Sequence, residues 1–246
     1  MARLSVNVNK VATLRNSRGG ALPSVVEAVR VCVDAGAPSI TVHPRADQRH
    51  IRPIDVRDIA EALEPLRDQV EYNIEGDPRP ELVELVAEVR PDQCTLVPVR
   101  PGEITSEAGW PADTPKEALS EIIARFHEGG TRVSVFVDAE PSAIDWAAEL
   151  GADRVELYTE PYARAFEQGG ETLDASVAKY RAATEHASAR GLGVNAGHDL
   201  DLANLPTFLA LPHIDEVSIG HALMARAVFV GLSTVVAEYL RITGSR

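Results

Sequence analysis

Residues 193–199 and 216–221 read GVNAGHD and EVSIGH, two short strand-like runs that end at His198 and His221. Six more strand-like runs lie along the chain, and each leads into polar or ionisable residues: LSVNVN (4–9), SITVHPR (39–45), VEYNIEG (70–76), QCTLVP (93–98), VSVFVDAE (133–140) and RVELYTE (154–160). Strands that alternate with helices and end in chemically active residues predict a (β/α)₈ TIM barrel with its active site at the carboxyl ends of the strands.

Segments with helical periodicity separate these runs and support the same fold. They cover 24–36, 54–68, 80–90, 115–130, 141–152 and 171–191. We expect the strands to be apolar on both faces, as buried parallel strands are. Two connections, 100–115 and 160–170, are longer than a bare barrel needs, so we expect functional loops there, with 100–115 as an active-site lid.

The composition indicates one globular domain over residues 1–246, close to the usual size of such a barrel. The net charge of −13 argues against a nucleic-acid partner or an anionic membrane. No apolar run approaches the length of a membrane span, and the polar residues near the N-terminus interrupt any signal peptide, so we expect a cytoplasmic protein. Cys32 and Cys94 lie in apolar stretches and are expected to be buried thiols.

Positive charge is concentrated near the N-terminus of this acidic chain. Residues 1–52 contain eight Lys or Arg and three acidic residues, a net charge of +5, which leaves −18 for the rest. A cationic region around the first two strand ends predicts that a small anion binds there. Ordinary solvated surface charge is the alternative, and we expect it for Arg3, Arg30 and Arg52.

Two segments suggest phosphate sites. In SIGHALMARAVFVG (218–231), a strand leads through Gly220 into a helix, and a helix N-terminus after the last strands is a common phosphate site in these barrels. The alternative is that Gly220 only makes a tight turn. TLRNSRGG (13–20) places Arg15 and Arg18 in a loop after the first strand.

HPRADQRH (43–50) adds His43, Arg45 and His50 after the second strand, which suggests a second phosphate site. Surface salt bridges are the alternative for Arg18 and Arg45.

Ionisable residues from five strands are expected to share the rim: His43, Glu75, Glu156, His198 and His221. Carboxylates in an enclosed mouth have raised pKa values and histidines titrate near neutrality, so these groups suit repeated proton transfer. His127, His186 and His213 are expected to be ordinary surface residues.

With these residues in view, the chain resembles the pyridoxine 5′-phosphate synthase family. The resemblance rests on VNVNKVATLRNSRGG (6–20), ITVHPRADQRHI (40–51), EYNIEG (71–76), TLVP (95–98) followed by EIT (103–105), VNAGHDL (194–200) and IGHALMARAVFVGL (219–232). It implies condensation of 1-deoxy-D-xylulose 5-phosphate with 3-amino-2-oxopropyl phosphate to give pyridoxine 5′-phosphate, phosphate and water. The resemblance implies that the imine forms between the two substrates, so no enzyme lysine is needed, and it implies a homo-oligomer, typically an octamer. We expect no cofactor, and no metal because Arg, helix N–H groups and His meet the phosphate charge.

The resemblance also implies roles for particular residues. His43 and Glu75 would accept protons, His198 would donate one, and Glu156 would stabilise a charged intermediate. Residues implied to bind the amino-ketone phosphate are Asn7, Asp199, Gly220 and His221. Residues implied to bind the deoxyxylulose phosphate are Asn9, Lys10, Arg18, Arg45, His50 and Thr105.

The chain departs from the best-known members in two places. Asn9 and Lys10 stand where those members have Asp and His, and Asp199 stands in place of a glycine. Lys10 adds a permanent cation, whereas the charge of Asp199 beside a phosphate would need compensation.

Three other functions compete with this interpretation. A lysine Schiff-base aldolase fits poorly, because the fifth and sixth strands contain no lysine. In a divalent-metal enzyme, His43, Glu75, Glu156 and His198 would be ligands, but no tight ligand cluster is evident. A phosphate-metabolite binding protein would not need so many ionisable rim residues.

Overall fold

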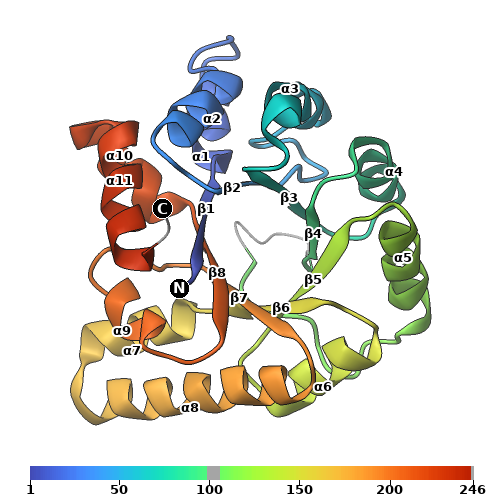
Figure 1. Ribbon diagram of the computed structural model, residues 1–246, viewed down its shortest axis with the longest axis vertical. Helices are drawn as coiled ribbons and strands as arrows, with labels where there is room; N and C mark the ends of the chain where they lie inside the picture. The colour runs from blue at the N-terminus through green and yellow to red at the C-terminus, as the bar shows by residue number, and fades with distance from the viewer. Residues whose placement is uncertain (99–105, 245–246) are drawn as a thin grey trace.

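Eight parallel strands close into a barrel in the order β1 to β8, in the computed structural model, which describes residues 1–98 and 106–244. The strands are β1 (Arg3–Asn7), β2 (Ser39–Val42), β3 (Glu71–Gly76), β4 (Gln93–Leu96), β5 (Arg132–Val137), β6 (Arg154–Tyr158), β7 (Gly193–Gly197) and β8 (Ile214–Ile219). Figure 1 looks into this ring with the helices outside it. The predicted (β/α)₈ barrel is confirmed.

Helices surround the barrel. They are α1 (Asn9–Asn16), α2 (Val25–Asp34), α3 (Pro53–Leu63) with the 3₁₀ turn η1 (Glu64–Leu66), α4 (Pro80–Val89), α5 (Glu117–Glu128), α6 (Pro141–Glu149), α7 (Glu160–Gln168), α8 (Gly170–Ala189), α9 (Leu205–Leu209), α10 (His221–Val230) and α11 (Leu232–Thr243). The six helices predicted from periodicity are all present. Where α5 and α6 end, Gly130 and Gly151 adopt φ of +82° and +84°, which glycine accepts without strain.

The strands are apolar on one face only, so the expectation of two apolar faces is wrong. Leu4, Val6, Ile40 and similar residues point outward into one hydrophobic core between the strands and the helices. The alternate residues are polar and buried inside the barrel: Ser5, Ser39, Thr41, Asn73, Gln93, Thr95, Ser134, Glu156, Asn195, Glu216 and Ser218. The period-2 alternation of the strands was therefore present in the sequence.

Hydrogen bonds between strands satisfy many of these interior groups, as burial of polar atoms requires. Ser5 and Thr41 hydroxyls lie 2.6 Å apart, and Asn73 Nδ2 donates to Thr41 at 3.2 Å. Across the barrel, Asn195 Nδ2 donates to Gln93 Oε1 at 3.2 Å. The interior is thus a polar network that lies beneath the carboxyl ends of the strands.

Two segments expected to be loops are helical. Residues 9–16 form α1, and residues 160–168 form α7, whose first turn contains Pro161 at a position where proline suits a helix start. The expected 160–170 loop is therefore wrong. In the described part of the chain, no helix is both long and apolar enough to cross a lipid bilayer.

Candidate active site

His43 and Glu75 lie at the carboxyl ends of β2 and β3, with His43 Nδ1 3.9 Å from Glu75 Oε2. Asn7 at the end of β1 donates from Nδ2 to the same carboxyl oxygen at 3.5 Å. Asn7 Oδ1 in turn accepts the backbone N–H of Asn9 at 3.0 Å, and Asn9 Oδ1 accepts the backbone N–H of His43 at 2.9 Å. The first two strand ends thus fix the position of both ionisable groups.

Burial favours the uncharged forms of this pair. It is the main cause that raises the pKa of Glu75 well above its ordinary value, and the charge of Glu156 adds to it. Burial also lowers the pKa of His43 well below its ordinary value, with further contributions from His50 and Arg45. The expected raised carboxylate pKa is confirmed, whereas the expectation that His43 titrates near neutrality is wrong.

Glu156 projects from β6 into the same end of the barrel. Burial first, and the Glu216 carboxylate second, raise the pKa of Glu156 to about 8. Glu156 Oε2 is buried and makes no hydrogen bond to any described residue. A methyl group at Gly197 would lie 2.7 Å from Glu156 Oε1, so the absence of a side chain at position 197 leaves the room that this carboxyl group needs.

His198 follows β7 and packs against two aromatic rings. The ring centroids of Tyr158 and Phe136 lie 5.2 and 6.3 Å from that of the imidazole. Tyr158 and Phe136 belong to a small apolar cluster with Val97, separate from the main core. The imidazole therefore lies at the mouth of the polar barrel on an apolar support that sequence reasoning did not predict.

A cationic group lies beside His43. His50 forms an edge contact with His43 at 6.0 Å between ring centroids, and both Arg45 and His43 are buried. Burial, then the charges of Arg45 and Lys10, lower the pKa of His50 to about 4. His43, Arg45, His50 and Lys10 are thus brought together as predicted, although His50 does not titrate near neutrality.

Arg15 is not part of this anion site. It lies on α1 rather than in a loop, and its guanidinium forms a bidentate pair with Asp55, with Nη1–Oδ1 and Nη2–Oδ2 distances of 2.5 and 2.8 Å. Both side chains are buried. Arg15 therefore joins α1 to α3 structurally. Arg18 is exposed in the connection between α1 and α2.

Gly220 precedes α10, and its φ of −117° is open to any residue. A methyl group there would lie 3.2 Å from Asn7 Cβ, which is tighter than ordinary contact. The close approach of β8 to β1, rather than a turn, therefore favours glycine at this position. His221 begins α10, so the predicted strand-to-helix step is confirmed.

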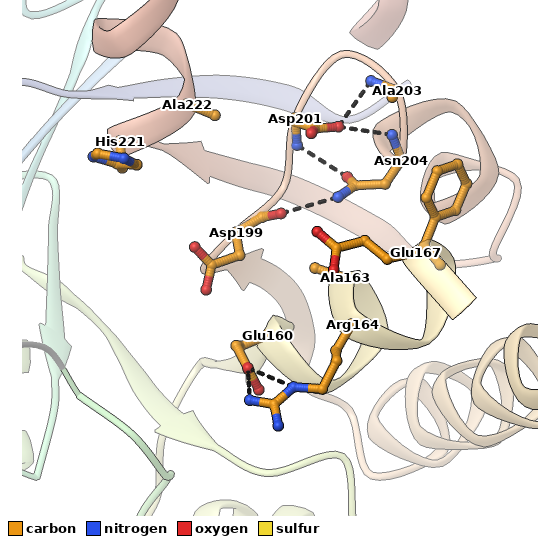
Figure 2. A pocket seen from close by; sticks show the side chains of 11 residues that line it. Glu160, Ala163, Arg164, Glu167, Asp199, Asp201, Ala203, Asn204, His221 and Ala222 are labelled. Atoms are coloured by element: carbon orange, nitrogen blue, oxygen red, sulfur yellow. Dashed lines mark hydrogen bonds and ion pairs between the residues drawn. The ribbon is translucent and has the colours of Figure 1, made fainter. Parts of the chain in front are cut away.

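A cavity of about 580 Å³ opens beside Asp199 and His221, between the starts of α7 and α10 and the loop after β7 (Figure 2). Its wall also contains Glu160, Glu167 and Asp201. Arg164 faces this wall but forms an ion pair with Glu160. Asp199 thus faces an acidic cavity.

The predicted lid divides into two parts. Residues 99–105, with Thr105, lie outside the described residues. Residues 106–115 are attached to the barrel: Trp110 donates from its backbone N–H to Phe136 O and from Nε1 to Leu96 O, both at 3.0 Å. The Trp110 ring also packs against Trp146 at 6.1 Å.

Comparison with known proteins places the chain in a family. Residues 4–245 match the model of the pyridoxal phosphate biosynthesis protein PdxJ. The chain belongs to the PdxJ family.

PdxJ relatives are similar over almost the full length. The chain is 51% identical to pyridoxine 5′-phosphate synthase of Bacteroides thetaiotaomicron over 240 residues, 97% of this chain and 98% of that protein. It is 46% identical to the enzyme of the same name from Leptospira biflexa over 252 residues, 98% and 97% of the two chains. The site residues therefore lie within a region of continuous similarity.

Solved structures of other proteins share only the fold with this PdxJ chain. Phosphoribosyl anthranilate isomerase from Thermus thermophilus has a TM-score of 0.63 at 18% identity, covering 99% of this chain and 98% of that one. A putative fructose-1,6-bisphosphate aldolase from Coccidioides immitis has a TM-score of 0.66 at 11% identity, covering 99% and 91%.

Arg79 is a site neighbour that sequence reasoning missed. It donates from Nη2 to the carbonyl oxygen of Pro44, between His43 and Arg45, and forms an ion pair with Asp77. Its charge also contributes to the low pKa of His43. A signal existed, because Arg79 closely follows the EYNIEG strand that ends in Glu75 and Gly76.

The part of the chain that the structure describes contains no cluster of metal-ligating side chains. Within 1–98 and 106–244, no group of three or more His, Cys, Asp or Glu side chains is arranged to hold one. The ligands considered for a metal enzyme, His43, Glu75, Glu156 and His198, therefore do not form such a group.

Proposed function

We propose that this chain is a pyridoxine 5′-phosphate synthase that condenses 1-deoxy-D-xylulose 5-phosphate with 3-amino-2-oxopropyl phosphate. Membership of the PdxJ family over residues 4–245 supports the reaction. The observation that supports the site most directly is the convergence of His43, Glu75 and Glu156 at one end of the barrel, where burial shifts the pKa of each.

The first step joins the two substrates. The amine nitrogen attacks the ketone carbon, both of its protons leave, and the carbonyl oxygen departs as water, so the enzyme has to move protons from nitrogen to oxygen. A neutral imidazole can accept a proton, and burial keeps His43 neutral. Glu75 accepts a proton only when ionised, and His198 returns protons to leaving oxygen atoms.

Glu156 stabilises positive charge on the intermediate. A protonated imine is a cation, and the buried Glu156 oxygen without a hydrogen-bond partner in the described chain is suited to face it. A cation at this site would also lower the pKa of Glu156 and favour its ionised form.

The two phosphate groups are bound at neighbouring parts of the rim, one after β1 and β2 and the other where β8 leads into α10. Asn9, Lys10, Arg45 and His50 bind the deoxyxylulose phosphate, together with Arg18 and Thr105. Asn7, Asp199 through its backbone, and the Gly220–His221 pair at the N-terminus of α10 bind the amino-ketone phosphate. Residues 100–115 close over the bound sugar phosphate, on the stem that Trp110 attaches to β4 and β5.

The chain functions as a homo-oligomer, an octamer by family resemblance. Five exposed apolar side chains on α1, α10 and the α1–α2 connection support this proposal: Leu14, Leu22, Val228, Phe229 and Val230. Helices α1, α2 and α10 pack together on one side of the barrel (Figure 1). Light scattering should give a mass several times 26.5 kDa, and Phe229→Ser should lower it.

The cytoplasm is the proposed compartment. Cys32 and Cys94 are both free and buried, as thiols are in a reducing environment.

Incubation of the purified protein with both substrates tests the reaction. Pyridoxine 5′-phosphate and inorganic phosphate should appear together, and omission of either substrate should abolish both. Absence of product with folded protein would reject the proposal. Complete inhibition by a chelator, reversed by one divalent ion, would support a metal enzyme instead, and binding of phosphate esters without turnover would support a binding protein.

A further inference from the structure

The backbone has an uncommon conformation at the end of β7. His198 and Asp199 have φ values of +95° and +56°, a region that side chains other than glycine rarely adopt. Aspartate tolerates the left-handed conformation better than most residues. Position 199 therefore has a backbone that glycine would satisfy without strain, and a carboxylate is present there instead.

Hydrogen bonds hold this backbone on both sides. The Thr159 hydroxyl contacts the carbonyl oxygens of Gly197 at 2.7 Å and His198 at 2.5 Å. On the other side, Asn204 Nδ2 donates to the carbonyl oxygen of Asp199 at 2.9 Å. The directions of the two side chains are thus fixed from the main chain.

The two side chains meet. Asp199 Oδ2 lies 3.4 Å from His198 Nδ1, and the imidazole rests edge-on against Tyr158 at 74° between ring planes. A histidine whose Nδ1–H is bound by a carboxylate has its ring orientation and tautomer fixed, with Nε2 available for proton transfer. The side chain of His198 is about one quarter exposed, so solvent only partly screens the carboxylate.

We propose that Asp199 is a positioning residue that accepts a hydrogen bond from His198 Nδ1–H and orients Nε2 toward the substrates. This proposal rests on the proposed role of His198 as proton donor. It gives the Asp199 side chain a function distinct from phosphate binding through its backbone. It also explains how a carboxylate is accommodated beside an anion site, since its charge is directed to an imidazole.

The charged groups around Asp199 and His198 also support this contact. The pKa of Asp199 is lowered first by its hydrogen bond with His198, and the charges of His198 and His221 also lower it. The other ionisable groups around the His198 ring and its Tyr158 support are Glu107, Asp138, Glu156 below Gly197, Glu160 on α7 and His221 on α10. Most are acidic, so removal of Asp199 should lower the pKa of His198 by a limited amount.

Titration of His198 in the folded, ligand-free protein tests the contact. Histidine resonances followed by NMR from pH 5 to 9, with His198 identified by its loss in His198→Gln, should show a pKa lower by about one unit in Asp199→Asn. Asp199→Gly should give the same decrease. Glu167→Gln is the matched control, because it removes a carboxylate from the same cavity wall and should leave the pKa of His198 within about 0.2 units.

Kinetics then separate positioning from substrate binding. In Asp199→Asn, the alkaline limb of the kcat profile should move down by the same amount as the pKa of His198, with little change in either Michaelis constant. An unchanged His198 pKa in both variants would overturn the proposal. The proposal would also be overturned if the pKa of His198 in Asp199→Gly alone equalled that in the unaltered protein, because position 199 would then have only a conformational role. The titration needs no turnover, so a failure of the proposed reaction would be recognised separately by the absence of product from the unaltered chain.

Discussion

His43 Nδ1 and Glu75 Oε2 lie 3.9 Å apart across the junction of β2 and β3, with both side chains almost fully buried. Burial raises the pKa of the carboxyl group and lowers that of the imidazole. Burial therefore favours an uncharged acid beside an uncharged base in the ligand-free protein. A substrate that brings charge into this site would change the protonation of both groups.

Substitution of the acid–base residues should reduce turnover far more than substrate affinity. His43→Ala, Glu75→Gln and His198→Ala should each lower kcat by about 10²–10⁴-fold, because such groups act mainly in the transition state. Steady-state kinetics on folded variants provides the measurement. His127→Ala and His186→Ala are matched controls, since both histidines lie on outer helices, where they form hydrogen bonds with Asp153 and Asp145. Near-normal kcat in a site variant would remove that residue from the mechanism.

Glu156→Gln should make the protein more stable at alkaline pH. The pKa of Glu156 is about 8 in the folded protein and near 4.5 when unfolded, so the folded state binds more protons and loses stability as pH rises from about 4.5 through 8. The neutral amide cannot ionise, so its advantage in unfolding free energy should be about 3–4 kcal/mol larger at pH 8 than at pH 5. Urea unfolding at the two pH values gives this difference. An equal change in unfolding free energy at pH 5 and pH 8 would show that ionisation of Glu156 does not destabilise the folded protein.

Lys10→Ala should weaken binding of the sugar phosphate selectively. Lys10 is exposed at the start of α1, and its positive charge contributes to the lowered pKa of His50. One ammonium near a phosphate contributes about 1 kcal/mol in water, so the Michaelis constant for deoxyxylulose phosphate should rise about fivefold. The constant for the amino-ketone phosphate should change little. Lys179→Ala removes the same charge from an outer helix, where it pairs with Glu140, and should affect neither.

Lys10→His extends this test to pH. The imidazole should restore part of the sugar-phosphate affinity at acidic pH and lose it as it deprotonates, whereas the lysine stays charged. Unchanged constants for both substrates in Lys10→Ala would mean that Lys10 faces solvent only.

Disruption of the pair between Arg15 and Asp55 should lower stability without a specific effect on binding. Arg15→Ala leaves the buried Asp55 carboxylate without its partner, which should reduce the unfolding free energy by about 3 kcal/mol. Arg57→Ala is the matched control, because its pair with Glu88 is about half exposed and should contribute far less. If Arg15→Ala raised a Michaelis constant strongly and left the unfolding free energy unchanged, Arg15 would instead be a residue of the anion site.

The fold could be predicted because eight strand-like runs and their intervening helices are local patterns. The rim residues His43, Glu75, Glu156 and His198 could also be predicted, since each lies at or near a strand end. The helix α1 was missed because NKVATLRN has little amphipathic pattern. Contacts between distant residues could not be predicted either: Arg15 and Asp55 are forty positions apart, and nothing local shows that they meet.

The alternation of polar and apolar residues along most of the strands also favours correct assembly of the barrel. If β3 shifted its register by one residue, Asn73 and Glu75 would face the apolar layer between strands and helices, and Ile74 would face the polar interior. Strands with two apolar faces would not meet such a penalty. The side-chain pattern of each strand therefore favours the native register. Two fragments produced by cleavage between α7 and α8 should for this reason pair their strands in the native register when they are mixed.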